Sequence, residues 1–183
     1  MENLALLRGI NVGGNNIIKM TDLKACFGSM SLTDVTTYIQ SGNVLFKCSG
    51  KNRENLTTRI EKVLSKRFNY KARAILVSHD ELRNAVKLAP KKFGKNPAKF
   101  RYDVIFLKKP LTASKAIKDI SIKEGVDRAD AGKDILYFSR LISKAGQSRL
   151  ARIVQLPMYQ HMTIRNWNTT TKLLVLMDAR AKT

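Results

Sequence analysis

The sequence predicts an α+β fold of two lobes: a ferredoxin-like βαββαβ lobe over residues 1–77, and a second, smaller α+β lobe over residues 78–183 that ends in C-terminal helices. Apolar runs and helical spacings alternate in the first lobe in the order strand, helix, strand, strand, helix, strand, which is typical of a split βαβ unit. The remaining residues mix both signals less regularly. A chain of 183 residues fits one domain or two small lobes that share a core.

Local signals define the elements of the first lobe. Thr21 is a good N-cap for the first helix, and Asn52 for the second. An alternating stretch breaks at Ser41-Gly42-Asn43, which indicates a hairpin with a short glycine-containing turn. The predicted elements are residues 4–7, 21–30, 35–40, 44–48, 52–68 and 74–77.

The second lobe has weaker signals, most of them at helix ends. Ser78 is a suitable cap for a short helix, Pro157 would stop a helix, and Thr163 is a suitable cap for the last one. A turn is expected over residues 130–132. After the helix at Ser78, the predicted elements are a strand over 102–107, a helix over 111–120, a strand over 134–138, and helices over 148–156 and 163–179.

Cysteine content and hydropathy indicate a soluble cytoplasmic protein. Cys26 and Cys48 form no CxxC pair and have no third thiol beside them, so we expect neither a disulfide framework nor a zinc site. We also expect no other metal and no cofactor. The apolar run at the N-terminus is too short for a signal peptide, and no stretch approaches the roughly 18 apolar residues of a membrane span. We expect no membrane partner.

Charge is the main compositional clue to function. The chain carries 34 basic and 14 acidic residues, a net charge of +20. Such an excess attracts polyanions, of which nucleic acid is the partner we favour.

The densest basic run covers residues 87–109, where Asp103 is the single acidic residue. Prolines and a glycine make its first part a loop, and Phe93, Phe100 and Tyr102 supply rings that can stack on bases. The alternative is a solvated loop in which the lysines confer solubility and the rings anchor the core. The candidate nucleic-acid-binding residues are Lys91, Lys92, Lys95, Lys99 and Arg101.

The glycine-rich loop after the first strand matches no standard phosphate loop. Gly9 and Gly14 have the glycine spacing of G-x-x-x-x-G-K-[ST], but Asn15 and Asn16 stand where lysine and serine or threonine are required. A dinucleotide fingerprint needs its last glycine at the start of a helix, and here several residues separate Gly14 from the predicted helix.

Topology gives this loop a different role. In a ferredoxin-like unit strands one and two run parallel, so the end of strand one and the turn after strand two lie at one edge of the sheet. Exposed backbone N–H groups, an arginine and amides at that edge suit a small phosphorylated or carboxylated ligand. Alternatively, these residues only shape the turns, and the arginine pairs with a carboxylate. The candidates are Arg8, Asn11, Gly13, Gly14, Gln40, Ser41 and Asn43.

A third polar block lies near the C-terminus. With Thr163 as N-cap, Arg165 and Asn166 fall in the first turn of the predicted helix and Thr169 one turn further, an arrangement that favours an anion. Trp167 has a spacing typical of core packing. We include Arg165, Asn166 and Thr169 among the candidate ligand-binding residues, although the sequence does not say whether they reach the glycine loop.

No catalytic constellation stands out, and the sequence leaves open whether the protein is an enzyme. His79 and His161 lack metal-ligand spacing, and Ser41 lacks the G-x-S-x-G elbow of a nucleophile. The aspartates near residue 130 do not follow a calcium-loop pattern, and turn chemistry accounts for them. The oligomeric state is likewise open.

Three blocks, LLRGINVGG at residues 6–14, TYIQSGNVLF at 37–46 and MTIRNWNTTTKL at 162–173, resemble the signature blocks of the bacterial family catalogued as domain of unknown function 1697. The resemblance runs over nearly the whole chain. It implies a compact two-lobed α+β protein of the bacterial cytoplasm, and it implies no established activity, substrate or cofactor.

Two functional hypotheses therefore follow from the sequence. The leading one is a non-enzymatic polyanion-binding protein that uses the basic loop. The rival is a small-molecule enzyme or sensor that uses the glycine-loop edge. A protein-interaction module is a third reading, and it would require an exposed apolar patch.

Overall fold

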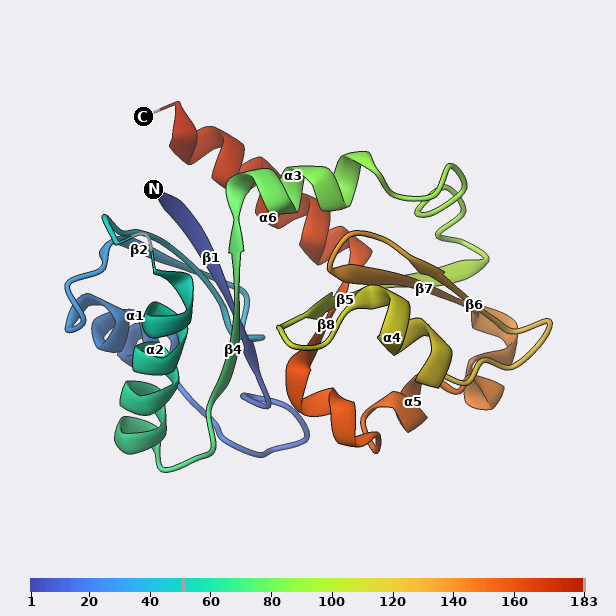
Figure 1. The fold of residues 1–183 in the computed structure, drawn as a ribbon, viewed down its shortest axis with the longest axis horizontal. Coiled ribbons are helices and arrows are strands. Elements are labelled where there is room, and N and C mark those ends of the chain that lie inside the picture. The colour runs from blue at the N-terminus through green and yellow to red at the C-terminus, as the bar shows by residue number, and fades with distance from the viewer. Residues whose placement is uncertain (51, 183) are drawn as a thin grey trace. The chain divides into compact units, whose positions relative to one another are not determined.

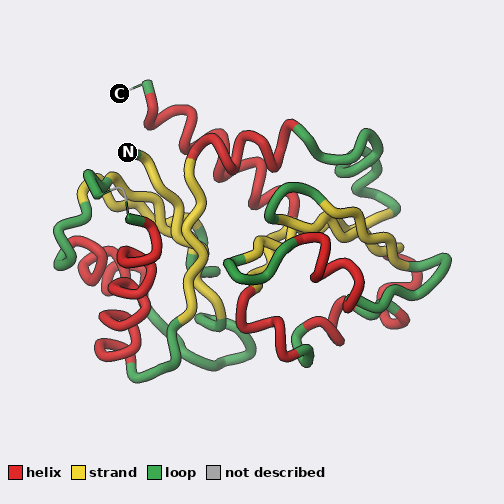
Figure 2. The backbone as a smooth tube through the Cα atoms, in the orientation of Figure 1, coloured by secondary structure: helices red, strands yellow, loops and turns green. Residues whose placement is uncertain are grey.

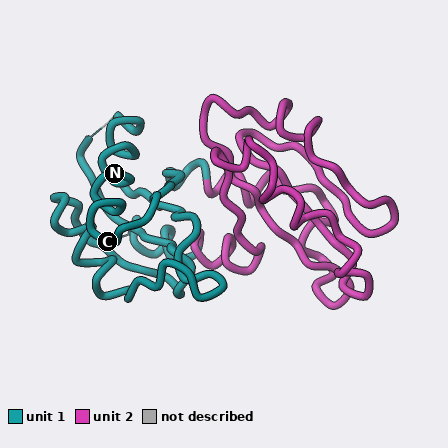
Figure 3. Tube along the Cα trace, turned by 90° about the horizontal axis from the view of Figure 1, so that it is seen from below, with its two compact units in different colours: residues 1–81, 175–183 teal, residues 82–174 magenta. Residues whose placement is uncertain are grey.

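The structure is a computed structural model that describes residues 1–50 and 52–182, and it divides the chain into two compact units (Figures 1 and 3). Unit 1 comprises residues 1–81 with 175–183, and unit 2 comprises residues 82–174. The described residues form two four-stranded antiparallel sheets, one in each unit, with helices beside them. None of the helices in the described ranges has the length and hydropathy needed to cross a membrane.

The sheet of unit 1 has the strand order β2-β3-β1-β4, and every neighbouring pair is antiparallel. Since β3 lies between β1 and β2, the end of β1 and the turn after β2 lie at the same edge of the sheet. The elements in chain order are β1 (Glu2–Arg8), α1 (Met20–Gly28), β2 (Thr33–Tyr38), β3 (Asn43–Lys47), α2 (Arg53–Phe68) and β4 (Arg73–Ser78).

Helices α1 and α2 cover one face of this sheet (Figure 1). Alternate residues of β1 and β3 point to that face, where they pack against buried side chains of both helices. The rings of Phe27 and Phe46 lie 5.6 Å apart at the centre of this contact. Burial of this apolar surface is what holds α1 and α2 to the sheet.

Two of the predicted caps in unit 1 are present, and one prediction is wrong. The Asn52 side chain accepts a hydrogen bond from the Asn55 backbone N–H at 2.9 Å, so it caps α2. Ser78 and Glu81 form a reciprocal capping box at the start of α3 (His79–Lys87). The first helix begins one residue before Thr21, and Lys19 occupies its cap position without a side-chain bond.

Unit 2 contains the second sheet, in the order β6-β7-β5-β8. Helices α4 and α5 pack against one face, where the buried residues include Ile105 and Leu107 of β5 and Leu136 and Phe138 of β7 (Figure 1). After α3, the elements are β5 (Phe100–Leu107), α4 (Ala113–Asp119), β6 (Asp127–Ala131), β7 (Ile135–Leu141), a 3-10 helix (Ile142–Gln147), α5 (Leu150–Ile153), a second 3-10 helix (Pro157–His161), β8 (Met162–Asn166) and α6 (Trp167–Ala181).

Several predictions for the second lobe are wrong. Residues 162–166 are the edge strand β8, and the last helix begins at Trp167. The β-branched pair Thr163 and Ile164 lies opposite Phe106 and Ile105 of β5, and this pairing prevails over Thr163 as a helix cap. Residues 127–131 form strand β6, so the turn predicted over 130–132 begins too early. The predicted helix over 148–156 shortens to the single turn α5.

The division into units also differs from the predicted lobes 1–77 and 78–183, because the end of α6 belongs to unit 1. Arg180 explains this placement. Its Nε lies 2.7 Å from Glu2 Oε1, its Nη1 donates to Thr36 Oγ1 at 2.8 Å, and its Nη2 lies 3.2 Å from the Asp34 carboxylate. The end of α6 is thereby attached to strands β1 and β2.

Candidate functional site

Unit 2 contains a groove of about 580 Å³ between the basic loop and the sheet. Residues 90–93 of the loop that joins α3 to β5 line one wall, and Phe100 and Tyr102 of β5 line the floor. The opposite wall comes from residues 125–128 together with Asp130 and Ser139. The groove thus lies on the face of the sheet that α4 and α5 do not cover.

The basic loop is a long connection between α3 and β5 (Figure 2), and side-chain contacts hold it in place. Phe93 is buried with its ring 4.9 Å from Tyr102, 5.1 Å from Tyr137 and 5.1 Å from Trp167, all in edge-on geometry. Gly94 has a φ of +76°, and a Cβ there would collide with the indole of Trp167. The loop can therefore reach this position only with glycine at residue 94.

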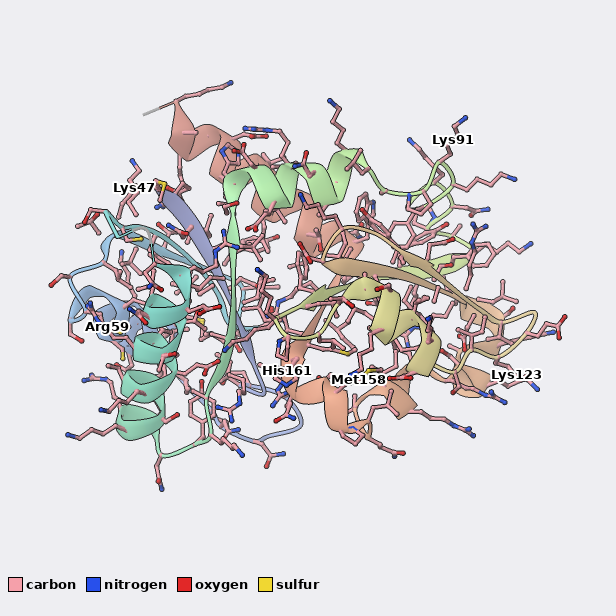
Figure 4. The ribbon with its side chains drawn as sticks, in the orientation of Figure 1. Lys47, Arg59, Lys91, Lys123, Met158 and His161 are labelled. Atoms are coloured by element: carbon pink, nitrogen blue, oxygen red, sulfur yellow. The ribbon has the colours of Figure 1, made fainter. Side chains whose placement is uncertain are left out.

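Hydrogen bonds close the turns of the same loop. The N–H of Phe93 donates to Pro90 at 2.7 Å, and the N–H of Phe100 donates to Asn96 at 3.0 Å. The Asn96 N–H donates to the Tyr102 hydroxyl at 3.2 Å. These bonds fix the backbone from which the lysines extend, and Figure 4 shows Lys91 pointing away from the ribbon.

The lysines of this loop carry charge that the fold does not neutralise. Lys91, Lys92 and Lys95 are exposed and form no ion pair with any residue in the described ranges. Unit 2 holds 20 basic and 6 acidic residues, a net charge of +14 out of +20 for the chain. The groove therefore lies in the more basic part of the protein.

The acidic side chains at the groove are already bound to protein groups. Asp130 accepts two hydrogen bonds from the guanidinium of Arg128, at 2.9 and 3.0 Å. Asp127 Oδ2 accepts from the N–H groups of Lys123 and Arg149. Their negative charge is thus partly compensated.

The structure separates the five predicted nucleic-acid-binding residues. Lys91 and Lys92 line the groove, and Lys95 and Lys99 are exposed on the same loop. Arg101 alternates with Phe100 and Tyr102 along β5, so it lies on the other face of the sheet.

Arg101 shares that other face with a buried acid–base pair. Asp103 is 6% exposed, and its Oδ2 lies 3.5 Å from Arg140 Nη2. Burial raises the pKa of the Asp103 carboxyl, and the charges of Arg140 and Arg101 oppose this increase only in part. Arg101 therefore acts on a structural carboxylate away from the groove.

In unit 1 the structure joins the glycine loop to the hairpin through Asn11. Its Nδ2 donates to the carbonyls of Gln40 and Ile18, at 2.9 and 3.0 Å, and its Oδ1 accepts from the Ile18 N–H at 2.8 Å. The Leu7 N–H also donates to the Gly42 carbonyl at 2.8 Å. The predicted neighbours are side by side, but the Asn11 amide is used to hold them together.

The other polar residues of this edge differ in their surroundings. Asn43 is fully buried, and its Nδ2 donates to the Tyr38 carbonyl and to Ser41 Oγ. Gln40, Gly13 and Gly14 are exposed, and both glycines have positive φ. The half-buried Arg8 ends β1, opposite Arg73 of β4.

The third predicted block lies in unit 2 rather than in the unit of the glycine loop. Arg165 is buried on β8, where its Nη1 donates to Thr163 Oγ1 at 2.9 Å and to the Ile164 carbonyl at 2.8 Å. Burial lowers its pKa to about 10, against the opposing effect of Tyr159. Asn166 accepts from the Asn168 N–H at the start of α6, and Thr169 lies half-buried one turn on. Arg165 is thus a strand residue and not part of a helix N-terminus.

Sequence reasoning missed the second wall of the groove. Arg128, Asp130 and Ser139 belong to strands β6 and β7, and β6 was not predicted. For the floor of the groove the sequence does carry a signal. Phe100 and Tyr102 alternate along a strand, which places both rings on one face of the sheet.

The structure places this protein in the class of mixed α+β proteins, with two four-stranded antiparallel sheets among the described residues. A family model described as "Protein of unknown function (DUF1697)" matches residues 1–137, and the chain belongs to this family, which confirms the suspected family. The blocks at 6–14 and 37–46 lie within the matched residues, and the block at 162–173 lies outside them. The structure is similar to that of the conserved bacterial protein SP0830 from Streptococcus pneumoniae, with a TM-score of 0.83 and 22% identity over 97% of this chain and 98% of that chain. At this identity the similarity shows a shared fold. No curated protein matches the sequence.

Proposed function

We propose that this protein is a cytoplasmic nucleic-acid-binding protein whose binding site is the groove of unit 2. The observation that carries the proposal is the groove itself, in which Lys91 and Lys92 stand beside Phe93, Phe100 and Tyr102. Lysines contribute affinity for the phosphate backbone, and the half-buried ring of Phe100 at the same site suits a base. Nothing in this arrangement requires catalysis.

The unneutralised charge supports the same conclusion. Exposed lysines without carboxylate partners retain their full attraction for phosphates, and binding releases the counterions of the nucleic acid. Four loop lysines (Lys91, Lys92, Lys95 and Lys99) predict a slope of log affinity against log salt of about −3 on single strands.

Fluorescence anisotropy with labelled mixed-sequence oligonucleotides tests this proposal. At about 50 mM salt the wild type should bind, and affinity should fall steeply as salt rises. Lys91→Glu with Lys92→Glu should weaken binding at least about tenfold, since two phosphate contacts become repulsive.

The matched control is Lys62→Glu with Lys66→Glu, which makes the same charge change on exposed residues of α2 in unit 1. It should weaken binding much less. Absence of binding at about 50 mM salt, or equal losses in the two double variants, would overturn the proposal.

A second proposal concerns the glycine-loop edge, as the site of a small-molecule enzyme or sensor for a phosphorylated or carboxylated ligand. It is supported by the exposed backbone of Gly13 and Gly14 beside the hairpin of Gln40 and Ser41. A panel of such ligands should raise the melting temperature of the wild type, and Arg8→Ala should abolish the shift without unfolding the protein. Failure of the whole panel would count against it.

We also propose that the lobe over residues 1–77 is ferredoxin-like. Its support is the element order of two βαβ-type halves and the sheet order β2-β3-β1-β4.

A further inference from the structure

We infer that the groove of unit 2 takes unpaired bases, so that its ligand is single-stranded nucleic acid with a base stacked on Phe100. This inference rests on the proposed function and narrows it, because the lysines alone would bind single and double strands alike. It depends on which ring of the groove is accessible.

Two of the three groove rings are committed to the core. Phe93 and Tyr102 are each 7% exposed, and their edge-on contact fixes both. The Tyr102 hydroxyl also accepts the Asn96 N–H. Neither ring offers a free face to a ligand.

Phe100 differs from them. It lines the groove but is only half-buried, and its ring lies 6.2 Å from that of Tyr102 at a tilt of 42°. The Lys99 ammonium lies over the ring, 5.8 Å from its centroid. Lys99 itself does not line the groove, so the part of the half-buried Phe100 side chain that does line it is accessible to a ligand.

A base stacked on Phe100 would be held more strongly than the Lys99 ammonium is. Stacking of a base on an aromatic ring is stronger than an exposed cation–π contact, and a displaced Lys99 remains close enough to meet the neighbouring phosphate. Lys91 and Lys92 line the same groove for further phosphates. The Phe100 ring can thus contact a base while the lysine ammonium groups contact the phosphates of the same single strand.

The size of the groove excludes a duplex as the stacked ligand. A volume of about 580 Å³ lies in the range of pockets that hold one small molecule, which suits a base with its sugar. In a duplex the bases are stacked on one another inside the helix, so only its phosphates could reach this site.

The experiment compares a mixed-sequence single-stranded 12-mer, the duplex of the same sequence, and a single strand of equal length that lacks bases. Phe100→Leu keeps most of the apolar contact and removes the aromatic face, and Phe100→Trp keeps it. The wild type should bind the single strand more tightly than the other two probes. Phe100→Leu should lose about 5- to 100-fold on the single strand, with the salt slope unchanged, and Phe100→Trp should bind like the wild type.

Equal affinity for the single strand and the duplex, or wild-type affinity of Phe100→Leu for the single strand, overturns this inference and leaves the proposed function standing. Loss of binding in Phe100→Trp equal to that in Phe100→Leu also overturns it. Absence of binding to all three probes overturns the proposed function itself.

Discussion

The glycine-loop edge of unit 1 and the basic loop of unit 2 are both polar loops next to a four-stranded sheet, yet they use their polar groups in opposite ways. In the glycine loop, Asn11 and Asn16 direct their amides to carbonyls of the loop itself or of the adjacent hairpin. In the basic loop, Phe93 and Gly94 provide the anchoring, and the lysines are left to solvent.

The comparison teaches where to look for a binding site in such a protein. A side chain that closes a loop cannot also bind a ligand without loosening that loop. Apolar and glycine anchors leave the ammonium groups of Lys91, Lys92 and Lys95 available. The groove therefore combines a rigid backbone with charge that the fold does not use. This arrangement favours ligand binding more than that of the glycine loop does.

The largest effect should come from the anchor of the basic loop. Gly94→Ala introduces a Cβ at positive φ and against Trp167, so it should lower the free energy of unfolding by about 2–4 kcal/mol and weaken nucleic-acid binding. Chemical denaturation and anisotropy measure the two losses. Gly146→Ala is the matched control, because its Cβ meets open space at an ordinary φ. An unchanged Gly94→Ala would show that the loop is not held as described.

A somewhat smaller loss of folding stability is expected from a change in the glycine loop. Asn11→Ala removes hydrogen bonds to both backbone groups of Ile18 and to the Gln40 carbonyl, at a residue with a φ of +53°, and should cost about 2–3 kcal/mol. Asn15→Ala, an exposed change in the same loop, should stay within about 0.5 kcal/mol. If the two variants were equally stable by denaturant titration, the contrast between the loops would fail.

The smallest effect concerns Asp103, on the face of β5 away from the groove. Because burial raises the pKa of its carboxyl in the folded state, the folded protein holds the proton more tightly than the unfolded chain does. Its contribution to stability is therefore present at low pH and is lost as pH rises from the ordinary value of 3.8 through the raised one. Asp103→Asn should flatten this part of the stability–pH profile, measured by denaturation at several pH values. A profile parallel to that of the wild type would contradict the assignment.

Sequence reasoning succeeded where a local interaction decides the structure. Asn52 caps α2, and Ser78 with Glu81 starts α3, because each motif closes its hydrogen bonds within a few residues. It failed for β8, where Thr163 has the chemistry of a cap but pairs with a strand far away in the sequence. The β-branched Thr163 and Ile164 favour a strand only weakly, and the pairing with β5 that decides the structure cannot be seen in the local sequence.

The same limit applies to the site. The dense basic run with its interleaved aromatic residues pointed to Lys91 and Lys92, and both line the groove. Arg101 was grouped with them because it is close in sequence, although strand alternation sends its side chain to the other face. The wall formed by Arg128 and Asp130 could be predicted only by first predicting strand β6, and the short polar sequence of β6 resembles a turn.

The attachment of Arg180 has a consequence for biosynthesis. The Glu2 side chain is largely covered where its carboxylate meets this guanidinium, and a covered carboxylate without a partner is costly. Residues 175–182 are synthesised after all the strands of both sheets, so this ion pair is among the last contacts that the chain can make. We therefore expect unit 1 to form its sheet and core early in synthesis and to reach its full stability only once residues 175–182 are added.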